Sequence, residues 1–166
     1  MGGRHFGRNR RAGGGVDPFL MMILFQAFQR FQQMERKPPA TLALIAANVL
    51  VYFEPGPLLD LFPLLEHTRA ICLNPVAVVE GWDWQRLVLS NFKHGDLYHL
   101  IYNMSSFLWK GHQLEHQMGS GAFLKMTFVL MVLTNLIAVA AAYVLSSFIP
   151  EYAHYYYGLC AFGFSG

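Results

Sequence analysis

Four polar side chains lie in apolar parts of this sequence, where such groups are costly unless they serve a purpose. His94, His99 and Asn103 come at the start of one apolar segment, and Ser165 stands in a Gly-Phe-Ser-Gly stretch of another. A serine hydroxyl is a weak nucleophile until a base takes its proton, and flanking glycines let a substrate carbonyl approach it. Imidazole and carboxamide groups can donate hydrogen bonds to the oxyanion that then forms. The combination predicts attack on a carbonyl such as that of a peptide bond.

Each of these residues also has a purely structural interpretation. A histidine at the start of a helix is usually a hydrogen-bonded interfacial residue, and an asparagine in a span often joins two helices. Short glycine and serine patterns are common, so the Gly-Phe-Ser-Gly stretch alone is weak evidence. His99 and Asn103, however, are four residues apart and share one face of a helix. Because Ser165 is expected at the same membrane depth, the coincidence favours catalysis.

The composition indicates that lipid surrounds much of this chain. Of its 166 residues, 54% are hydrophobic and only 13% are charged, whereas a soluble domain carries about 25% charged residues. An aromatic content of 15% excludes a disordered chain. The net charge is only +2 and the basic residues form no stripe, so we expect no nucleic-acid partner. Nothing in the sequence predicts a metal site or a cofactor.

Two regions precede the first predicted span. Residues 1–16 are basic and rich in glycine, and we expect a disordered cytosolic tail. Residues 17–37 have the pattern of an amphipathic helix, with Asp17 as its N-cap and Pro18 in its first turn. Polar residues interrupt its apolar face, which favours a helix lying in the membrane interface. The alternative is a short span over residues 19–28.

The remainder of the chain, residues 38–166, is predicted to be the N-terminal part of an all-α bundle of transmembrane helices. The connection over residues 54–96 is rich in leucine and proline, so we expect it to be embedded in the interface. The predicted spans cover residues 39–53, 97–113 and 122–149, followed by the start of a fourth over residues 158–166.

The distribution of basic residues predicts the orientation. Seven Lys and Arg residues precede the first span, and three lie in the long connection. The positive-inside rule therefore places the N-terminus in the cytosol and the connection on the lumenal side. Both cysteines, Cys72 and Cys160, are then expected on that side. The sequence does not place them within bonding distance, so of the two alternatives, free thiols are favoured over a disulfide.

Four motifs in the right order resemble those of the rhomboid intramembrane serine proteases. They are the Trp-Gln-Arg of residues 84–86, the H-x4-H-x3-N pattern of residues 94–103, the E-x3-G-S segment of residues 115–120 and the G-x-S-G of residues 163–166. The Leu-Trp-Lys-Gly stretch and the Pro-Pro start of the first span look most like the endoplasmic-reticulum subgroup of this family.

By this resemblance, Ser165 would be the nucleophile, and His94 and Asn103 would help to form the oxyanion hole. Arg86 would anchor the embedded connection. The other matched positions would shape the surroundings of the site: His99, Trp84, Glu115, Gly119, Gly163 and Gly166. The family's general base is a histidine on its sixth span, which has no counterpart among the seven histidines here; His154 is a weak alternative.

The resemblance implies a serine endopeptidase in the endoplasmic reticulum that cleaves transmembrane protein substrates, with the lipid bilayer as its surroundings. Because the sequence stops directly after the serine motif, we expect an incomplete gene model or a truncated product, inactive as it stands. The alternative function is a non-catalytic rhomboid-like protein that binds transmembrane clients and directs them to degradation machinery. A small three-span structural protein is a third and weaker interpretation.

Overall fold

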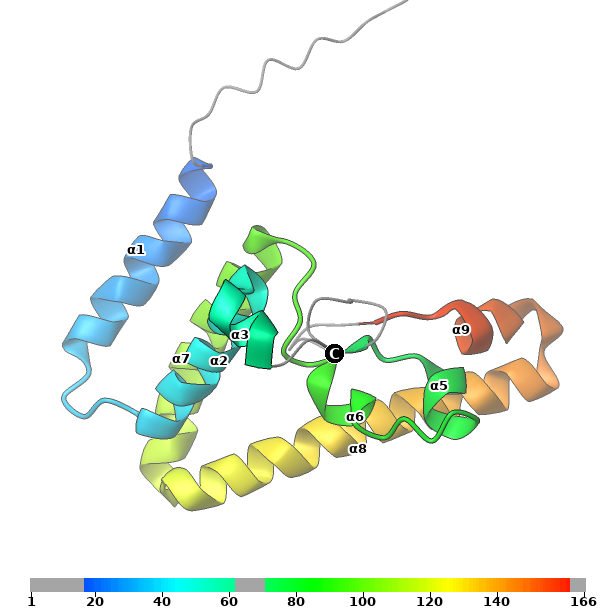
Figure 1. Ribbon diagram of the computed structural model, residues 1–166. Coiled ribbons are helices and arrows are strands. Elements are labelled where there is room, and N and C mark those ends of the chain that lie inside the picture. The colour runs from blue at the N-terminus through cyan, green and yellow to red at the C-terminus, as the bar shows by residue number, and fades with distance from the viewer. Residues whose placement is uncertain (1–16, 62–70, 162–166) are drawn as a thin grey trace, which may run out of the picture.

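The computed structural model describes residues 17–61 and 71–161, which are predominantly helical (Figure 1). The described residues contain one isolated antiparallel bridge, between Leu73 and Ala161, and no strand. The predicted all-α fold is therefore confirmed. In chain order the elements are α1 (Pro18–Gln33), α2 (Pro39–Phe53), α3 (Gly56–Leu61), α5 (Pro75–Val79), α6 (Arg86–Leu89), α7 (Leu97–Met118), α8 (Ser120–Phe148), η2 (Pro150–Tyr152) and α9 (Ala153–Gly158).

The first helix, α1, lies beside α7 and runs in the same direction (Figure 1). Phe19 stacks on Tyr98 near the start of α7, with ring centroids 6.0 Å apart. Three turns further along, the guanidinium of Arg30 lies 5.4 Å from the centre of the Trp109 ring. α1 thus shares the depth of the predicted span over residues 97–113, as the short-span alternative requires. Whether α1 crosses the membrane or lies in its interface stays a prediction.

Helices α2 and α7 approach each other closely because one residue at their contact lacks a side chain. A Cβ atom on Gly111 of α7 would lie only 2.6 Å from Thr41 Cγ2 of α2. Thr41 is completely buried in this contact. Small residues permit such close approach between helices in membranes, where packing rather than hydrophobic exclusion drives association.

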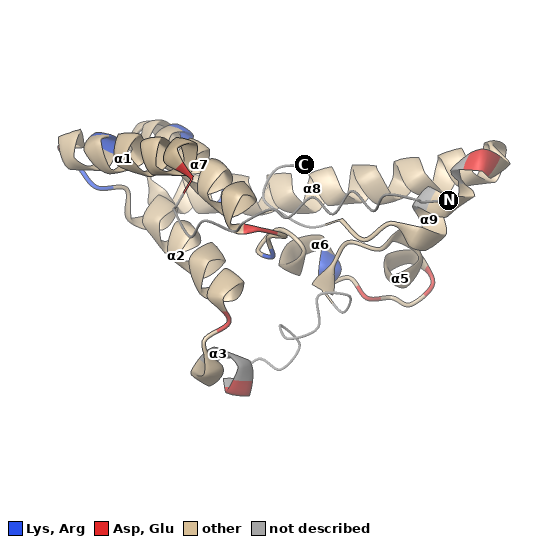
Figure 2. Cartoon of the chain, turned by 90° about the horizontal axis from the view of Figure 1, so that it is seen from above, with Lys and Arg blue, Asp and Glu red and all other residues tan. Residues whose placement is uncertain are grey.

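The long helix α8 leaves α7 at Gly119 and extends away from the group of α1, α2 and α7 (Figures 1 and 2). The short helices α5, α6 and α9 pack along it. On α8, the side-chain amide of Asn135 donates hydrogen bonds to Leu87 O (2.8 Å) and Ser90 Oγ (3.2 Å), which attaches the connection to this helix. The main apolar cluster lies between the connection and α8 and consists of Leu73, Val78, Leu87 and Val139.

Among the described residues, only α8 is both long and apolar enough to cross a bilayer, with a mean hydropathy of 2.4 over its most apolar window. Most of that window faces away from the protein, since only 17% of it is buried. α2 is apolar but has 15 residues, fewer than the ~20 of an ordinary span. The predicted spans over residues 39–53, 97–113 and 122–149 overlap with α2, α7 and α8, and the crossing of the membrane by these three helices stays a prediction.

In the segment predicted to begin a fourth span, the described residues 159–161 are not helical. α9 ends at Gly158, and the chain is then extended as far as Ala161, which pairs with Leu73. Because only its first residues are described, the start of a fourth span over residues 158–166 stays a prediction. Residues 162–166, and the basic tail of residues 1–16, lie outside the described residues.

Candidate active site

The start of α7 is fixed by a side chain that lies between the two histidines of the motif. Asp96 is the N-cap: its carboxylate accepts a hydrogen bond from His99 N (2.8 Å), and its carbonyl accepts one from Leu100 N (3.1 Å). A negative charge at this position also complements the helix dipole. Because the cap sets the first turn, His99 and Asn103 lie on one face of α7, in successive turns.

His94 and Asn103, the two predicted oxyanion donors, are both buried, with 4% and 7% of their surface exposed. The ring of His94 meets the ring of His99 edge to face, with centroids 5.2 Å apart. Among the described residues, no group hydrogen-bonds either ring nitrogen of His94. Since buried polar atoms are normally paired, His94 is an exception of the kind that functional sites contain.

The surroundings of His94 favour its neutral form. Burial lowers the pKa of His94 below its ordinary value of 6.5, and the neighbouring His99 acts in the same direction, while the backbone of Phe92 and the Asp96 carboxylate oppose both. A neutral imidazole carries one N–H donor and one acceptor nitrogen. His94 is therefore suited to donate a hydrogen bond to an oxygen that acquires negative charge during a reaction.

Arg86 fixes the connection that leads to His94. Its Nε donates to Asp83 Oδ2 at 2.6 Å, and its Nη1 donates to the carbonyl oxygen of Cys72 at 2.8 Å. Trp84, the other matched residue of this motif, is half exposed and lies edge-on to Trp82, with centroids 5.9 Å apart. The arginine thus joins two distant parts of the connection, while Trp84 presents its ring at the surface.

A disulfide joins Cys72 in the connection to Cys160, which precedes Ser165 by five residues. This corrects the expectation of free thiols. The pairing links residues 88 positions apart, so no local pattern indicates it. The available clue was weaker: both cysteines were predicted on the lumenal side, where disulfides form and persist.

Hydrogen bonds on both sides of the disulfide support the same contact. Leu73 and Ala161 exchange two backbone hydrogen bonds, of 2.7 and 3.1 Å. The side-chain amide of Asn74 donates to the carbonyl oxygen of Leu159 at 2.8 Å. The chain that enters the Gly-Phe-Ser-Gly stretch is therefore held against the connection by one covalent bond and three hydrogen bonds. Sequence analysis did not identify Asn74 as part of this arrangement.

At the other end of α7, the buried carboxylate of Glu115 joins three helices. It accepts hydrogen bonds from Ala40 N (2.9 Å), Thr41 N (2.8 Å) and Thr41 Oγ1 (2.7 Å), all at the start of α2. It also accepts one from Ser120 Oγ (2.7 Å), at the start of α8. Gly119 makes the turn between α7 and α8 with φ 82°, a backbone conformation that favours glycine. These two residues thus define the turn between the helices.

Of the remaining predicted site residues, the structure describes only His154. Ser165, Gly163 and Gly166 lie outside the described residues. His154, the alternative base, is exposed and its Nδ1 lies 2.7 Å from the carbonyl oxygen of Glu151, a local contact within α9 and the turn before it. The described part of the site therefore consists of His94, His99 and Asn103 at the start of α7, beside the disulfide-linked connection.

The Rhomboid domain matches residues 81–166, slightly more than half of the chain and all of the site just described. This chain belongs to the rhomboid family. The match begins in the connection, before Trp84 and Arg86, and includes the H-x4-H-x3-N and G-x-S-G motifs. Family membership agrees with the apolar helices of the fold and identifies the chain as a rhomboid-like membrane protein.

Individual relatives match nearly the whole chain. The Arabidopsis thaliana protein "Rhomboid-like protein 14, mitochondrial" is 39% identical over 162 residues, which are 98% of this chain and 46% of that protein. "Rhomboid-related protein 4" of Mus musculus is 33% identical over 92% of this chain and 44% of the relative. The Homo sapiens protein of the same name is 33% identical over 95% of this chain and 46% of the relative. This chain spans less than half the length of these relatives. No solved structure matches it significantly.

Proposed function

We propose that the protein to which this chain belongs is a serine endopeptidase that cleaves transmembrane proteins within or near the membrane. Ser165 is the nucleophile in this proposal. Its Oγ attacks the scissile carbonyl carbon, its proton passes to a base, and the carbonyl oxygen becomes an oxyanion held by His94 and Asn103. Collapse of this intermediate expels the amine of the C-terminal fragment, which takes the proton back from the base. Water then gives a proton to the base, hydrolyses the acyl-enzyme and releases Ser165.

The observation that carries the proposal is the burial of His94 and Asn103 at the start of α7. Oxyanion stabilisation needs donors that are held in place before the reaction and are shielded from water. His94 is buried, is expected to be neutral at pH 7 and contacts His99. A protein that only binds helices has no need for such a donor, whereas an acyl-transfer enzyme does.

The general base is not assigned to any histidine of this chain. His94 and His99 are placed as a donor and its neighbour, and His154 is engaged with the backbone of Glu151. The proposal therefore requires a histidine on a helix beyond the 166 residues, as the family resemblance implies. A serine without its base retains only a small residual rate enhancement from oxyanion stabilisation and binding.

The disulfide supports a lumenal position for the site. A Cys72–Cys160 bond persists in an oxidising compartment and is rare in the cytosol. This agrees with the orientation that the positive-inside rule predicts for the connection, in the lumen of the endoplasmic reticulum. Non-reducing electrophoresis of the protein from isolated microsomes tests the bond directly.

The decisive experiment measures cleavage of a single-span reporter by the full-length protein in proteoliposomes. We expect Ser165→Ala to abolish cleavage, and His94→Ala and Asn103→Ala each to lower kcat by roughly 10²–10³. Ser147→Ala is the matched control, because this exposed hydroxyl donates to the carbonyl oxygen of Tyr143 within α8 and its loss should leave the rate unchanged.

The second candidate function is the binding of transmembrane clients without cleavage, followed by their transfer to degradation machinery. The large apolar surface that α8 leaves uncovered suits such binding as well as it suits a substrate. If the Ser165→Ala protein degrades clients in cells as fast as the wild type, and no cleavage fragment forms with either, the client-binding function replaces the protease.

A further inference from the structure

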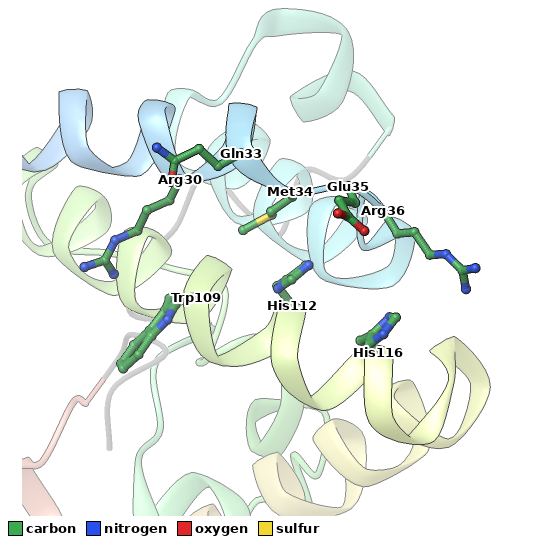
Figure 3. Close-up of a pocket in the computed structure, with 8 residues that line it drawn as sticks. All are labelled: Arg30, Gln33, Met34, Glu35, Arg36, Trp109, His112 and His116. Carbon is green, nitrogen blue, oxygen red and sulfur yellow. The ribbon is translucent and has the colours of Figure 1, made fainter.

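A cavity of about 780 Å³ lies far from the candidate active site, between the C-terminal ends of α1 and α7 (Figure 3). Its lining is rich in side chains that bind anions. Arg30 and Arg36 contribute guanidinium groups, and His112 and His116 contribute imidazoles. Glu35 is the only acidic residue among those that line it.

The cationic side chains come from two separate elements. Figure 3 shows His112 and His116 projecting from α7 toward the segment that links α1 to α2, while Arg30 reaches from α1 toward Trp109. The guanidinium of Arg30 lies 5.4 Å from the centre of the Trp109 ring, a cation–π contact that orders the arginine without neutralising it. The two imidazole rings are nearly parallel, with centroids 6.3 Å apart.

Neither arginine of the cavity is neutralised by a carboxylate. Within residues 17–61 and 71–161, neither Arg30 nor Arg36 forms an ion pair. Lys37, which is adjacent in sequence, is engaged elsewhere: its Nζ donates to the carbonyl oxygen of Phe31. The cavity therefore offers two arginine forks that can each donate two hydrogen bonds to a phosphate.

The location of the cavity indicates the source of the anion. It lies at the end of α7 opposite to His94, which the charge distribution predicts to be the cytosolic face. A half-exposed tryptophan, Trp109, is typical of the headgroup level. Basic pockets between helices on the cytoplasmic side bind the headgroups of anionic lipids, and cytoplasmic leaflets supply such lipids.

We propose that this cavity binds the phosphate-bearing headgroup of an anionic lipid. Arg30 and Arg36 extend toward opposite ends of the cavity in Figure 3, so they pair with phosphate groups at the two ends of the headgroup. The imidazoles of His112 and His116 donate further hydrogen bonds, and Trp109 lies beside the upper part of the acyl chains. The lipid would bridge α1 and α7 and hold α1 in its position. The proposal does not depend on proteolytic activity.

The test titrates the full-length protein, purified in a non-ionic detergent, with dioctanoyl phosphatidylinositol 4-phosphate by calorimetry. We expect saturable binding with one site per chain, and weakening of about fivefold for each of Arg30→Gln and Arg36→Gln. The matched control is Lys125→Gln, which removes an exposed cation of α8 at the same membrane face but outside the cavity. Far-UV circular dichroism checks that all three variants keep their helices.

Each outcome decides the proposal. A loss that is confined to the two arginine variants, with no binding of dioctanoyl phosphatidylcholine, supports it. An equal loss in Lys125→Gln overturns it, because the face as a whole would then attract the lipid. Equal affinity for phosphatidylcholine, or no binding at all, overturns it too. If free inositol 1,4-bisphosphate binds as tightly as the lipid, the ligand is a soluble phosphate and the lipid assignment is wrong.

Discussion

Buried polar residues lie near both ends of α7, but they differ in their hydrogen bonding. At the C-terminal end, the carboxylate of Glu115 accepts four hydrogen bonds from α2 and α8. Just before the N-terminal end, His94 is equally buried but has no hydrogen-bond partner for its ring nitrogens among the described residues. A polar group whose hydrogen-bonding capacity is used, or saturated, thus lies near one end of α7. An unsaturated group, without such partners among the described residues, lies near the other end.

We expect this difference to separate a structural role for Glu115 from a chemical role for His94. A saturated carboxylate has no capacity left for a substrate, so the position of Glu115 serves the geometry of three helices. An imidazole that keeps its donor in a dry environment costs stability, since an unpaired buried polar group is penalised by ~1–3 kcal/mol. Such a cost is typical of residues that are held ready for a reaction, and substitutions should reveal which end serves which purpose.

The largest effect on stability is expected for Glu115→Ala. Two backbone N–H groups and two hydroxyls lose their acceptor, at ~1–3 kcal/mol for each group that remains buried, and we expect a loss of roughly 4 kcal/mol in the free energy of unfolding. SDS-induced unfolding in mixed micelles, followed by circular dichroism, measures this. Glu151→Ala, on an exposed carboxylate, is the control and should change little. A stable Glu115→Ala protein with no activity would contradict the structural role.

Loss of the disulfide at the N-terminal side should have the next largest effect. Cys72→Ser with Cys160→Ser opens a link between residues 88 positions apart, and removal of a native disulfide typically costs ~2–5 kcal/mol. We expect about 3 kcal/mol by the same unfolding measurement, with dithiothreitol giving an equal loss in the wild type. If the double variant unfolds like the wild type, the contact between the connection and Cys160 is not maintained in solution.

A smaller effect is expected where α2 and α7 meet. Gly111→Ala introduces a Cβ that would lie 2.6 Å from Thr41 Cγ2, so the helices must separate, at a cost of ~1–3 kcal/mol for overpacking. Gly121→Ala is a matched helical control, since its Cβ would meet no atom within 4 Å. Equal stability of the two variants would show that the close approach of α2 and α7 is not required.

The smallest effect is expected on the pH dependence of stability, through His94 near the N-terminal end of α7. Because the pKa of His94 is lowered in the folded protein, its contribution to stability is complete above about pH 6.5, the pKa of the unfolded chain. Below that pH the unfolded chain binds a proton that the folded chain does not, so this contribution decreases until the pH reaches the folded-state pKa. We expect a steeper loss of stability from pH 7 to 5 in the wild type than in His94→Gln. Parallel curves would show that His94 is not buried as a neutral group.

Local patterns predicted the helices well. Asp17 and Asp96 were identified as caps, and both accept the expected backbone hydrogen bonds. The predicted spans overlap with α2, α7 and α8 because apolar runs and capping residues act within a few positions of each other. The pairing of Ala161 with Leu73 was not predicted, because its partner lies far away in the sequence, and the fourth span over residues 158–166 stays a prediction.

The sequence by itself determined the family to which this chain belongs and predicted its candidate site residues, because both depend on residue types at fixed short spacings. Only the tertiary structure decided the Cys72–Cys160 bond, the four partners of Glu115 and the course of α1 beside α7. These contacts join residues separated by up to 88 positions. Hydrophobic periodicity reports which face of a helix is apolar, but it contains no information about which distant segment packs against that face.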